Sequence, residues 1–437
     1  MKLPKMKFTA VGDLLIQRLI STEYDGFNEL SDYIRKGDAR FFNFESIIYR
    51  DGLWGNQFNG GSHHYSDKKT LNIIEKYGFN MATFANNHTF DWGYGGLIST
   101  LEAFNESNFV HSGAGMNLDE ASAPAYLDTK NGRVALISMT SSFVNVAAMA
   151  GKQSRRTLGR PGVNALRVNR YLEVTEENLK FLDTLSEECG INSEIAIARG
   201  EGYVAKKENL DSVELGWHLR CVLGDKNKYH VDLIESDMKR LEKAIYQAKE
   251  QADYILVSIH CHENEGNSKE NPASFLVEFA HRCIDMGAHA VLGHGPHLLR
   301  PLEIYKNCPI FYSLGDFVLH NESLNLAPED FYEKYGLTSD DPICEVYRKR
   351  SHNYTVGLLT DRRMLEAVVP YFEMEDGKLT HLELLPIELG FDEPRYRKGN
   401  PRICTDRGIL ERYAKMSEPY GTKMKINSDG IAVVELD

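Results

Sequence analysis

The sequence predicts an α/β fold in which buried strands alternate with amphipathic helices around a layered sheet. Short apolar runs recur along most of the chain, and each is followed by a longer stretch whose apolar residues have helical spacing. Polar side chains gather where the predicted strands end. The 437 residues include 42% hydrophobic and 26% charged side chains, an ordinary globular composition that can bury a large core.

The first third of the chain alternates predicted strands and helices regularly. Residues 66–78 illustrate the helix signal, because Leu71, Ile74 and Tyr77 form an apolar stripe and Gly78 provides a stop. The predicted strands here are residues 7–13, 39–46, 79–86 and 132–140, and the predicted helices are residues 26–38, 66–78 and 93–107.

The alternation resumes after a less regular, partly charged segment at residues 150–235, which we interpret as an insertion or lid. The predicted elements that follow are helices 235–251 and 272–287 and strands 253–260, 288–295 and 308–317. We therefore predict one main domain over residues 7–325.

Residues 326–437 form either a small second domain or an α+β extension packed on the main domain. Residues 365–389 are typical of a β-hairpin, because the Asp376-Gly377 pair favours a tight turn between two apolar runs. Residues 406–421 are predicted to form a closing helix.

Charge and cysteine content exclude some classes of protein. The net charge of −13 argues against a nucleic-acid partner, because phosphate binding needs a basic surface. No run reaches the roughly 18 apolar residues of a membrane span, so we expect no integral membrane segment. The seven cysteines lack C-x-x-C spacing, which favours reduced thiols and a cytoplasmic location.

The polar residues at the strand ends are the candidates for chemistry, since ligands of α/β sheets gather at the carboxyl ends of strands. Each one alone has a structural explanation, such as a capping turn at the two asparagines before His88. Together they predict one shared polar site. Its candidate residues are Asp13, Asn43, Glu45, Asn87, His88, Asp91, His260, His294, His297 and Asp316.

This set of side chains favours a divalent metal ion. Imidazoles, carboxylates and an amide oxygen suit Zn, Mn, Fe, Mg or Ca, and the site has enough donors for one or two ions. Two ions would suit amide hydrolysis or phosphoryl displacement by activating a water molecule. Asp91 follows His88 by three residues and could orient its imidazole.

Other polar motifs are less specific. Arg160 and Arg167 lie in a loop shaped by glycine and proline, and either they bind a substrate carboxylate or the stretch is solvated. His63 and His64 are expected in a surface loop. Cys261 alternates with His260 along a strand and is therefore expected to face away from the site.

Several segments between Lys7 and Val318 occur in a specific order. They read FTAVGDLLIQR, FFNFES, FNMATFANNHTFDWGYGGLISTL, HSGAGMNLDEA, VSIHCHENE and VLGHGPHLLRPLEIYKNCPIFYSLGDF. Together they resemble the CapA family, the poly-γ-glutamate capsule synthesis proteins. The resemblance implies a calcineurin-like, metallophosphoesterase-type fold, which is a four-layer α/β/β/α sandwich, here with the small C-terminal α+β extension.

The resemblance also implies positions for the metal ligands. Asp13 would occupy the first-strand position and Glu45 the position of a bridging aspartate. Asn87 and His88 would match an Asn-His pair, His260 a strand-end histidine, and His294 or His297 the terminal histidines. This chain departs from the pattern at Leu15, where phosphoesterases have a histidine, and at Gly295, where many CapA sequences have one.

The favoured hypothesis is a metal-dependent hydrolase or transferase, with a role in capsule biosynthesis implied by the resemblance. Its substrate would be an anionic small molecule or peptide, such as a poly-γ-glutamate-type amide. His88, His260, His297 and Asp91 would act in catalysis, whereas Arg160, Arg167, Asn43 and Asp316 would bind substrate. Three alternatives stay open: a phosphoesterase, a peptide epimerase with a His/carboxylate acid–base pair, and a non-catalytic module that binds an anionic polymer.

Overall fold

The computed structural model describes residues 2–205 and 211–436, which form two compact units. The larger unit comprises the chain up to Leu166 together with the chain from Lys239 onward, and the smaller unit is Arg167–Met238. The predicted insertion at residues 150–235 contains most of the smaller unit, and its residues 206–210 lie outside the described residues. The boundary predicted between a main domain at residues 7–325 and an extension at residues 326–437 is still a prediction.

The larger unit contains a 10-stranded sheet built around β1 (Met6–Leu15). Strands β1, β2, β3 and β4 are parallel neighbours in chain order. The connections between these strands all advance in the same direction across the sheet. Because such connections are right-handed, their helices α1, α2 and α3 lie on one face of the sheet. The bounds are β2 (Ala39–Phe44), β3 (Met81–Thr83), β4 (Val110–Ser112), α1 (Phe27–Ile34), α2 (Lys69–Tyr77) and α3 (Gly93–Asn105).

A 6-stranded sheet has the order β15-β16-β14-β13-β7-β6. Its parallel strands β7, β13 and β14 are linked by helices α7 and α8, and α8 packs against β14 and β16. The bounds are β6 (Ala125–Thr129), β7 (Gly132–Thr140), β13 (Tyr254–His260), β14 (Ala290–His294), β15 (Leu299–Tyr305), β16 (Cys308–Leu314), α7 (Glu235–Lys249) and α8 (Ser274–Met286).

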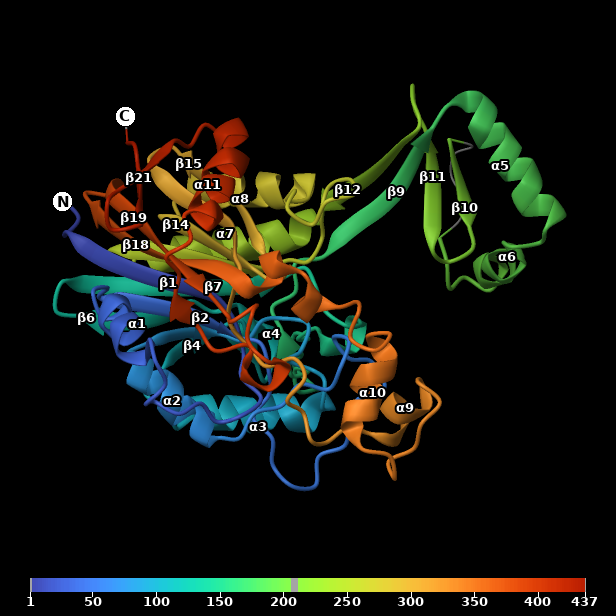
Figure 1. Ribbon diagram of the computed structural model, residues 1–437. Helices are drawn as coiled ribbons and strands as arrows, with labels where there is room; N and C mark the ends of the chain where they lie inside the picture. The colour runs from blue at the N-terminus through green and yellow to red at the C-terminus, as the bar shows by residue number, and fades with distance from the viewer. Residues whose placement is uncertain (1, 206–210, 437) are drawn as a thin grey trace. The chain divides into compact units, whose positions relative to one another are not determined.

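The two sheets pack face to face, with contacts between β1 and both β14 and β16. Helices α1, α2 and α3 cover the outer side of the first sheet (Figure 1). The resulting order of helices, sheet, sheet and helices confirms the predicted four-layer α/β/β/α sandwich. No helix in the described ranges combines the length and apolar character that a membrane crossing requires.

The C-terminal segment contributes strands to the first sheet. β18 (Glu366–Glu375) pairs antiparallel with β1, and β19 (Lys378–Glu388) pairs with β18 across the predicted turn. The turn residues Asp376 and Gly377 have φ values of 52° and 76°, as a tight hairpin turn requires. The remaining elements are β17 (Asp316–Leu319), β20 (Arg402–Ile403), β21 (Met424–Ile426), β22 (Ala432–Val434), α9 (Glu329–Glu333), α10 (Ile343–Arg350) and α11 (Gly408–Ser417).

A short connection follows the first sheet. It contains β5 (Ala114–Gly115) and α4 (Leu118–Ser122), and β5 pairs with β8 (Gly162–Val163), which comes later in the chain, after β7. The predicted strand 79–86 was too long, because β3 ends at Thr83 and the chain then turns at Asn86, whose side chain bonds neighbouring strand ends.

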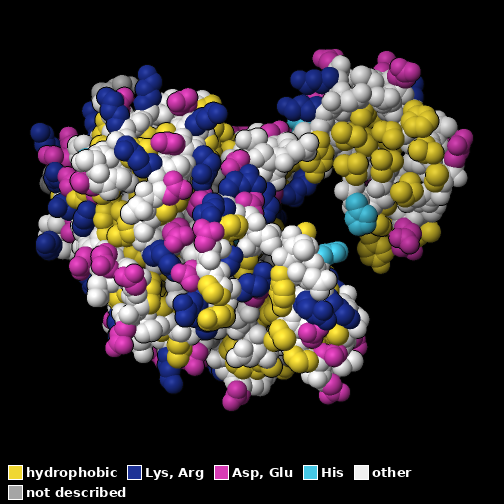
Figure 2. All heavy atoms as spheres, in the orientation of Figure 1, with side chains coloured by type: hydrophobic (Ala, Val, Ile, Leu, Met, Phe, Trp, Pro, Cys, Tyr) yellow, Lys and Arg dark blue, Asp and Glu magenta, His cyan; other side chains and the backbone are white. Residues whose placement is uncertain are grey.

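The smaller unit is a 4-stranded sheet of order β10-β11-β9-β12 with α5 packed against β10 and β11. It exposes several large apolar side chains, among them Phe181, Ile197, Tyr203 and Trp217. Figure 2 shows apolar side chains gathered on one face of this unit. The bounds are β9 (Val168–Val174), β10 (Ser212–Leu215), β11 (Leu219–Leu223), β12 (Lys228–Leu233), α5 (Glu176–Glu188) and α6 (Ser193–Gly200).

A candidate metal centre at the strand ends

Polar side chains meet where the parallel strands of both sheets end. Asp13 pairs in register with Asn43 on one side and with Asp316 on the other, and His260 pairs with His294. We call this group the polar corner; it consists of Asp13, Asn43, Glu45, Asn87, His88, Asp91, His260, His262, His294, His297 and Asp316. All of these except His262 were candidates from the sequence, so the fold brings the predicted strand ends together.

Asp13 sits at the centre of this network and is fully buried. Its Oδ1 accepts a hydrogen bond from Asn43 Nδ2 at 2.6 Å, and its Oδ2 accepts one from the Gly295 amide at 2.8 Å. Burial alone would raise the pKa of Asp13, but the imidazoles of His260 and His294 outweigh it and hold that pKa well below its usual range. Asp13 is therefore an anion ready to bind a cation.

His260 and His294 lie beside this anion. His294 Nδ1 is 3.3 Å and His260 Nδ1 is 3.7 Å from Asp13 Oδ1, and the two Nδ1 atoms are 2.9 Å apart. Tetrahedral zinc with bonds of about 2.1 Å would separate its ligand atoms by roughly 3.4 Å, so these three atoms fit around one ion. Burial lowers the pKa of His260 to about 4, which keeps the ring neutral, as a metal ligand must be.

Glu45 is the residue whose surroundings best fit a bound cation. It is fully buried, and neither carboxylate oxygen has a hydrogen-bond partner among the described residues. His88 Nε2, His260 Nε2 and His297 Nδ1 surround it at 3.7–3.9 Å, too far for hydrogen bonds. Burial, followed by the charges of Asp13, Asp316 and Asp91, raises the pKa of Glu45 well above its usual range. A divalent ion would supply the missing partner and remove this penalty.

His88 is held in a fixed orientation by Asp91. The Nδ1 of His88 lies 2.6 Å from Asp91 Oδ2, which leaves its Nε2 directed toward Glu45. Asp91 also accepts hydrogen bonds from the amides of Gly60 (2.9 Å) and His64 (2.8 Å). A carboxylate that orients a histidine in this way is typical of metal sites, and it is the role predicted for Asp91.

The two asparagines before His88 have different surroundings. Asn86 is structural, since its Nδ2 donates to Asn43 Oδ1 at 3.1 Å and to the Phe44 carbonyl at 2.9 Å. Asn87 instead directs its Oδ1 at His260 Nε2, 2.7 Å away, and at His262 Nε2, 3.3 Å away. Only Asn87 therefore offers an oxygen to the corner.

His297 and Asp316 form a second His–carboxylate pair, with 3.1 Å between Nδ1 and Oδ1. Burial lowers the pKa of His297, but Asp316 outweighs it and leaves the pKa raised. Burial raises the pKa of Asp316 to about 6 in spite of the opposing charge of His297. Their contact places the imidazole and the carboxylate within reach of one proton, as acid–base chemistry requires.

The prediction that His63 and His64 lie in a surface loop was wrong. Both are buried, with 3% and 1% of their surface exposed. The His64 ring stacks on His88 with 3.7 Å between centroids and 4° between planes. The loop is buried because Asp91 accepts hydrogen bonds from the backbone amides of Gly60 and His64, which hold the loop against the polar corner.

The two predicted substrate arginines make no hydrogen bond or ion pair with the corner in the described part of the chain. Arg160 is exposed and donates to the Met149 carbonyl. Arg167 belongs to the smaller unit, where its guanidinium binds Asp237 through Nε (2.9 Å) and Nη2 (2.8 Å). Their role in substrate binding stays a prediction.

Several groups of side chains could each hold an ion, and they overlap. They are Asp13 with His260 and His294, Glu45 with His260 and His262, and Asp13 with Glu45 and His297. His262 was missing from the predicted ligands, although it follows His260 by two residues and so points to the same side of an extended chain.

Comparison with known proteins identifies relatives along most of the chain. A family described as "Bacterial capsule synthesis protein PGA_cap" matches residues 7–321. An uncharacterized protein of Sinorhizobium fredii is 31% identical over 98% of this chain and 92% of its own length. The capsule biosynthesis protein CapA of Bacillus anthracis is 25% identical over 72% of this chain and 60% of its own length.

Among solved structures, a hypothetical protein from Thermus thermophilus aligns with 88% of this chain and 99% of its own length. The identity is 11% and the TM-score is 0.37, a level of likeness that carries no argument about function.

Proposed function

The chain belongs to the bacterial capsule synthesis protein PGA_cap family, and from this premise we propose that it is a metal-dependent enzyme that cleaves or transfers an amide of an anionic peptide. We take the substrate class from the CapA relatives, which are capsule biosynthesis proteins. A poly-γ-glutamate-type chain is an example of this class. The observation that carries the proposal is the buried, unpartnered carboxylate of Glu45 between three imidazoles.

Asp13, His260 and His294 would hold one divalent ion, and Glu45, with His88, Asn87 and His262 around it, would hold the same or a second ion. Zn, Mn, Fe, Mg and Ca are the candidates, because the donors are oxygen and imidazole nitrogen. A bound ion would act as a Lewis acid toward the carbonyl oxygen of the substrate.

The remaining steps belong to the protein. Asp91 keeps His88 in one orientation, so that no reorganisation of this ring is needed during the reaction. His297, with its raised pKa, donates a proton to the departing nitrogen as the carbon–nitrogen bond breaks. Asp316 stabilises the protonated ring before this transfer, and in hydrolysis it accepts the proton that the attacking water molecule loses as the water oxygen bonds to the carbonyl carbon.

Mass spectrometry of γ-glutamyl oligopeptides incubated with metal-loaded protein tests this function. We expect shorter chains from hydrolysis or longer ones from transfer, with both lost in His88→Ala and kept in the control variant His381→Ala. Deuterium uptake at Cα without cleavage would instead identify an epimerase. Turnover of p-nitrophenyl phosphate alone would identify a phosphoesterase, and binding without any turnover would identify a module that only binds the polymer.

We place this activity in a capsule- or polyglutamate-related process and, as predicted, in the cytoplasm. All seven cysteines are free thiols, which suits a reducing compartment. Fractionation of cells that express the full chain, followed by immunodetection, measures its location directly.

A further inference from the structure

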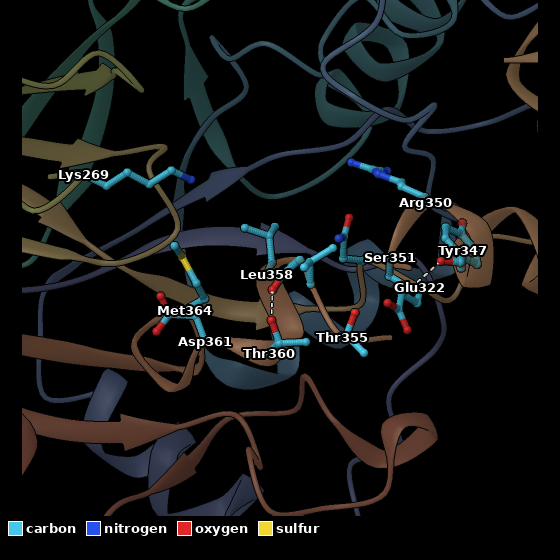
Figure 3. A pocket seen from close by; sticks show the side chains of 13 residues that line it. Lys269, Glu322, Tyr347, Arg350, Ser351, Thr355, Leu358, Thr360, Asp361 and Met364 are labelled. Carbon is cyan, nitrogen blue, oxygen red and sulfur yellow. Dashed lines mark hydrogen bonds between the residues drawn. The ribbon is translucent and has the colours of Figure 1, made fainter. Parts of the chain in front are cut away.

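A cavity of about 530 Å³ opens in the larger unit between the C-terminal segment and the loop after β13. Figure 3 shows Lys269 and Arg350 entering it from opposite sides, with their charged ends directed toward each other. The other lining residues are Asn321, Glu322, Tyr347, Ser351, Thr355, Val356, Gly357, Leu358, Thr360, Asp361 and Met364.

The charges around this cavity do not cancel. Its two acidic residues are already paired, since Glu322 binds Arg395 and Asp361 binds Arg363. Lys269 Nζ and the Arg350 guanidinium, by contrast, have no hydrogen bond or ion pair from their side chains to any described residue. The charge of Lys269 reaches Asp361 only at longer range, where it helps to lower the pKa of that carboxyl group. Two cations that face one cavity without a direct ion pair create a favourable potential for an anion.

A third polar group lacks a partner. The Tyr347 side chain is buried, and its hydroxyl has no hydrogen bond within the described residues. Burial raises the pKa of this hydroxyl, so it stays a neutral donor.

The backbone that carries Lys269 is fixed by Arg300, which is fully buried. Arg300 donates to the carbonyls of Lys269 (2.8 Å), Cys261 (3.1 Å) and His262 (3.1 Å). One guanidinium therefore links the loop at the cavity to His262 of the polar corner. Lys269 is an exposed side chain on a firmly held backbone.

The cavity lies next to the polar corner. A Cβ added to Gly61 would be 3.6 Å from Arg350 Nη2, and one added to its neighbour Gly60 would be 2.6 Å from His88 Cε1. Burial is the main cause that lowers the pKa of His88, and the positive charge of Arg350 lowers it further. The adjacent residues Gly60 and Gly61 therefore lie close to His88 and to Arg350, respectively.

We propose that this cavity binds a free carboxylate of the substrate, with Lys269 and Arg350 as its charged ligands, and thereby places the adjacent amide at the polar corner. The inference rests on the proposed function for the identity of the substrate, a peptide with a carboxylate beside the reacting bond. It assigns substrate recognition to Lys269 and Arg350, two residues that are 81 positions apart in the sequence.

Calorimetric titration of the full chain with tri-γ-glutamate tests this proposal. We expect the Kd to rise roughly tenfold to hundredfold in Lys269→Gln and in Arg350→Gln, because each variant loses one charge-assisted contact. The matched controls Lys152→Gln and Arg156→Gln change exposed residues and should bind as the wild type does. A peptide whose α-carboxylates are converted to carboxamides should bind as weakly to the wild type as tri-γ-glutamate binds to the variants.

Equal binding by wild type and cavity variants, or equal binding of the amidated peptide, would overturn the proposal. If inorganic phosphate at the same concentration as tri-γ-glutamate displaced the peptide completely, the cavity would be a phosphate site and the proposal would be overturned. The two proposals fail separately. Loss of binding in the variants without turnover by the wild type leaves the cavity proposal standing and removes the enzymatic one. Turnover by the wild type, with a KM that is unchanged in both variants, would leave the enzymatic proposal standing and remove the cavity proposal.

Discussion

Glu45, which is fully buried, and Glu263, which is partly buried, both follow strand ends, and their surroundings are opposite. Glu263 accepts hydrogen bonds from Ser141 Oγ and Ser142 Oγ, both at 2.9 Å. Burial raises the pKa of Glu263, but these and a backbone hydrogen bond outweigh it and lower that pKa below its usual range. Glu45 has no such donors, and its pKa is raised.

The difference shows that burial alone does not identify a functional carboxylate. A carboxylate with hydrogen-bond donors is already satisfied and stabilises the fold. A carboxylate that faces only imidazoles at 3.7–3.9 Å is satisfied when a cation arrives. Glu45 is therefore the candidate for the proposed metal chemistry, whereas Glu263 is held by hydrogen bonds of the framework.

The largest expected effect is on metal binding. Glu45→Gln keeps the shape of the side chain but removes its charge, so we expect metal affinity and activity to fall by about 100-fold or more. Glu263→Gln should keep the metal content of the wild type. Elemental analysis after dialysis against a defined metal buffer measures the metal content of both variants. Equal metal loss in the two would show that Glu45 and Glu263 do not differ in metal binding.

A smaller effect is expected on the stability of the metal-free protein. Glu263→Gln weakens hydrogen bonds to an ionised acceptor and should lower the free energy of unfolding by about 1–3 kcal/mol. Glu45→Gln should leave this free energy unchanged or raise it, because it removes a buried, unpaired charge. Urea denaturation in the presence of a chelator compares the two, and the comparison is contradicted if Glu45→Gln is the less stable variant.

The smallest effect is on the pH dependence of stability. The folded pKa of Glu45 is above its value of about 4.5 in the unfolded chain, so its contribution is lost as pH rises from 4.5 through the folded pKa. The folded pKa of Glu263 is below that value, so its contribution is lost as pH falls below about 4.5.

Melting temperatures of the metal-free proteins across this pH range reveal the opposite signs. Relative to the wild type, Glu45→Gln should gain stability with rising pH above 4.5, and Glu263→Gln should lose its disadvantage with falling pH below 4.5. Parallel curves for all three proteins would show that neither carboxylate is perturbed as described.

Much of the candidate site could be predicted from the sequence because its residues follow strands with strong local signals. A buried apolar run that ends in a polar residue locates Asp13, His260 and His294 without knowledge of the fold. Parallel strands then bring their carboxyl ends to one edge of the sheet. The metal-binding role of these residues is still a prediction.

The parts that could not be predicted depend on contacts distant in sequence. No local pattern pairs β18 with β1, because their residues are more than 350 positions apart. The burial of His64 depends on hydrogen bonds to Asp91, 27 positions later. Lys269 and Arg350 meet only because a loop after β13 and the end of α10 border the same cavity.

The pairing of β1 has a consequence for synthesis of the chain. β1, which carries Asp13, pairs on one edge with β2 and on the other with β17 and β18, which end at Leu319 and Glu375. A nascent chain on the ribosome therefore has an open edge on this strand until most of its length has emerged. Asp316, the last residue of the polar corner, precedes β18 in the chain, so partly synthesised chains that end before Asp316 lack part of the proposed site.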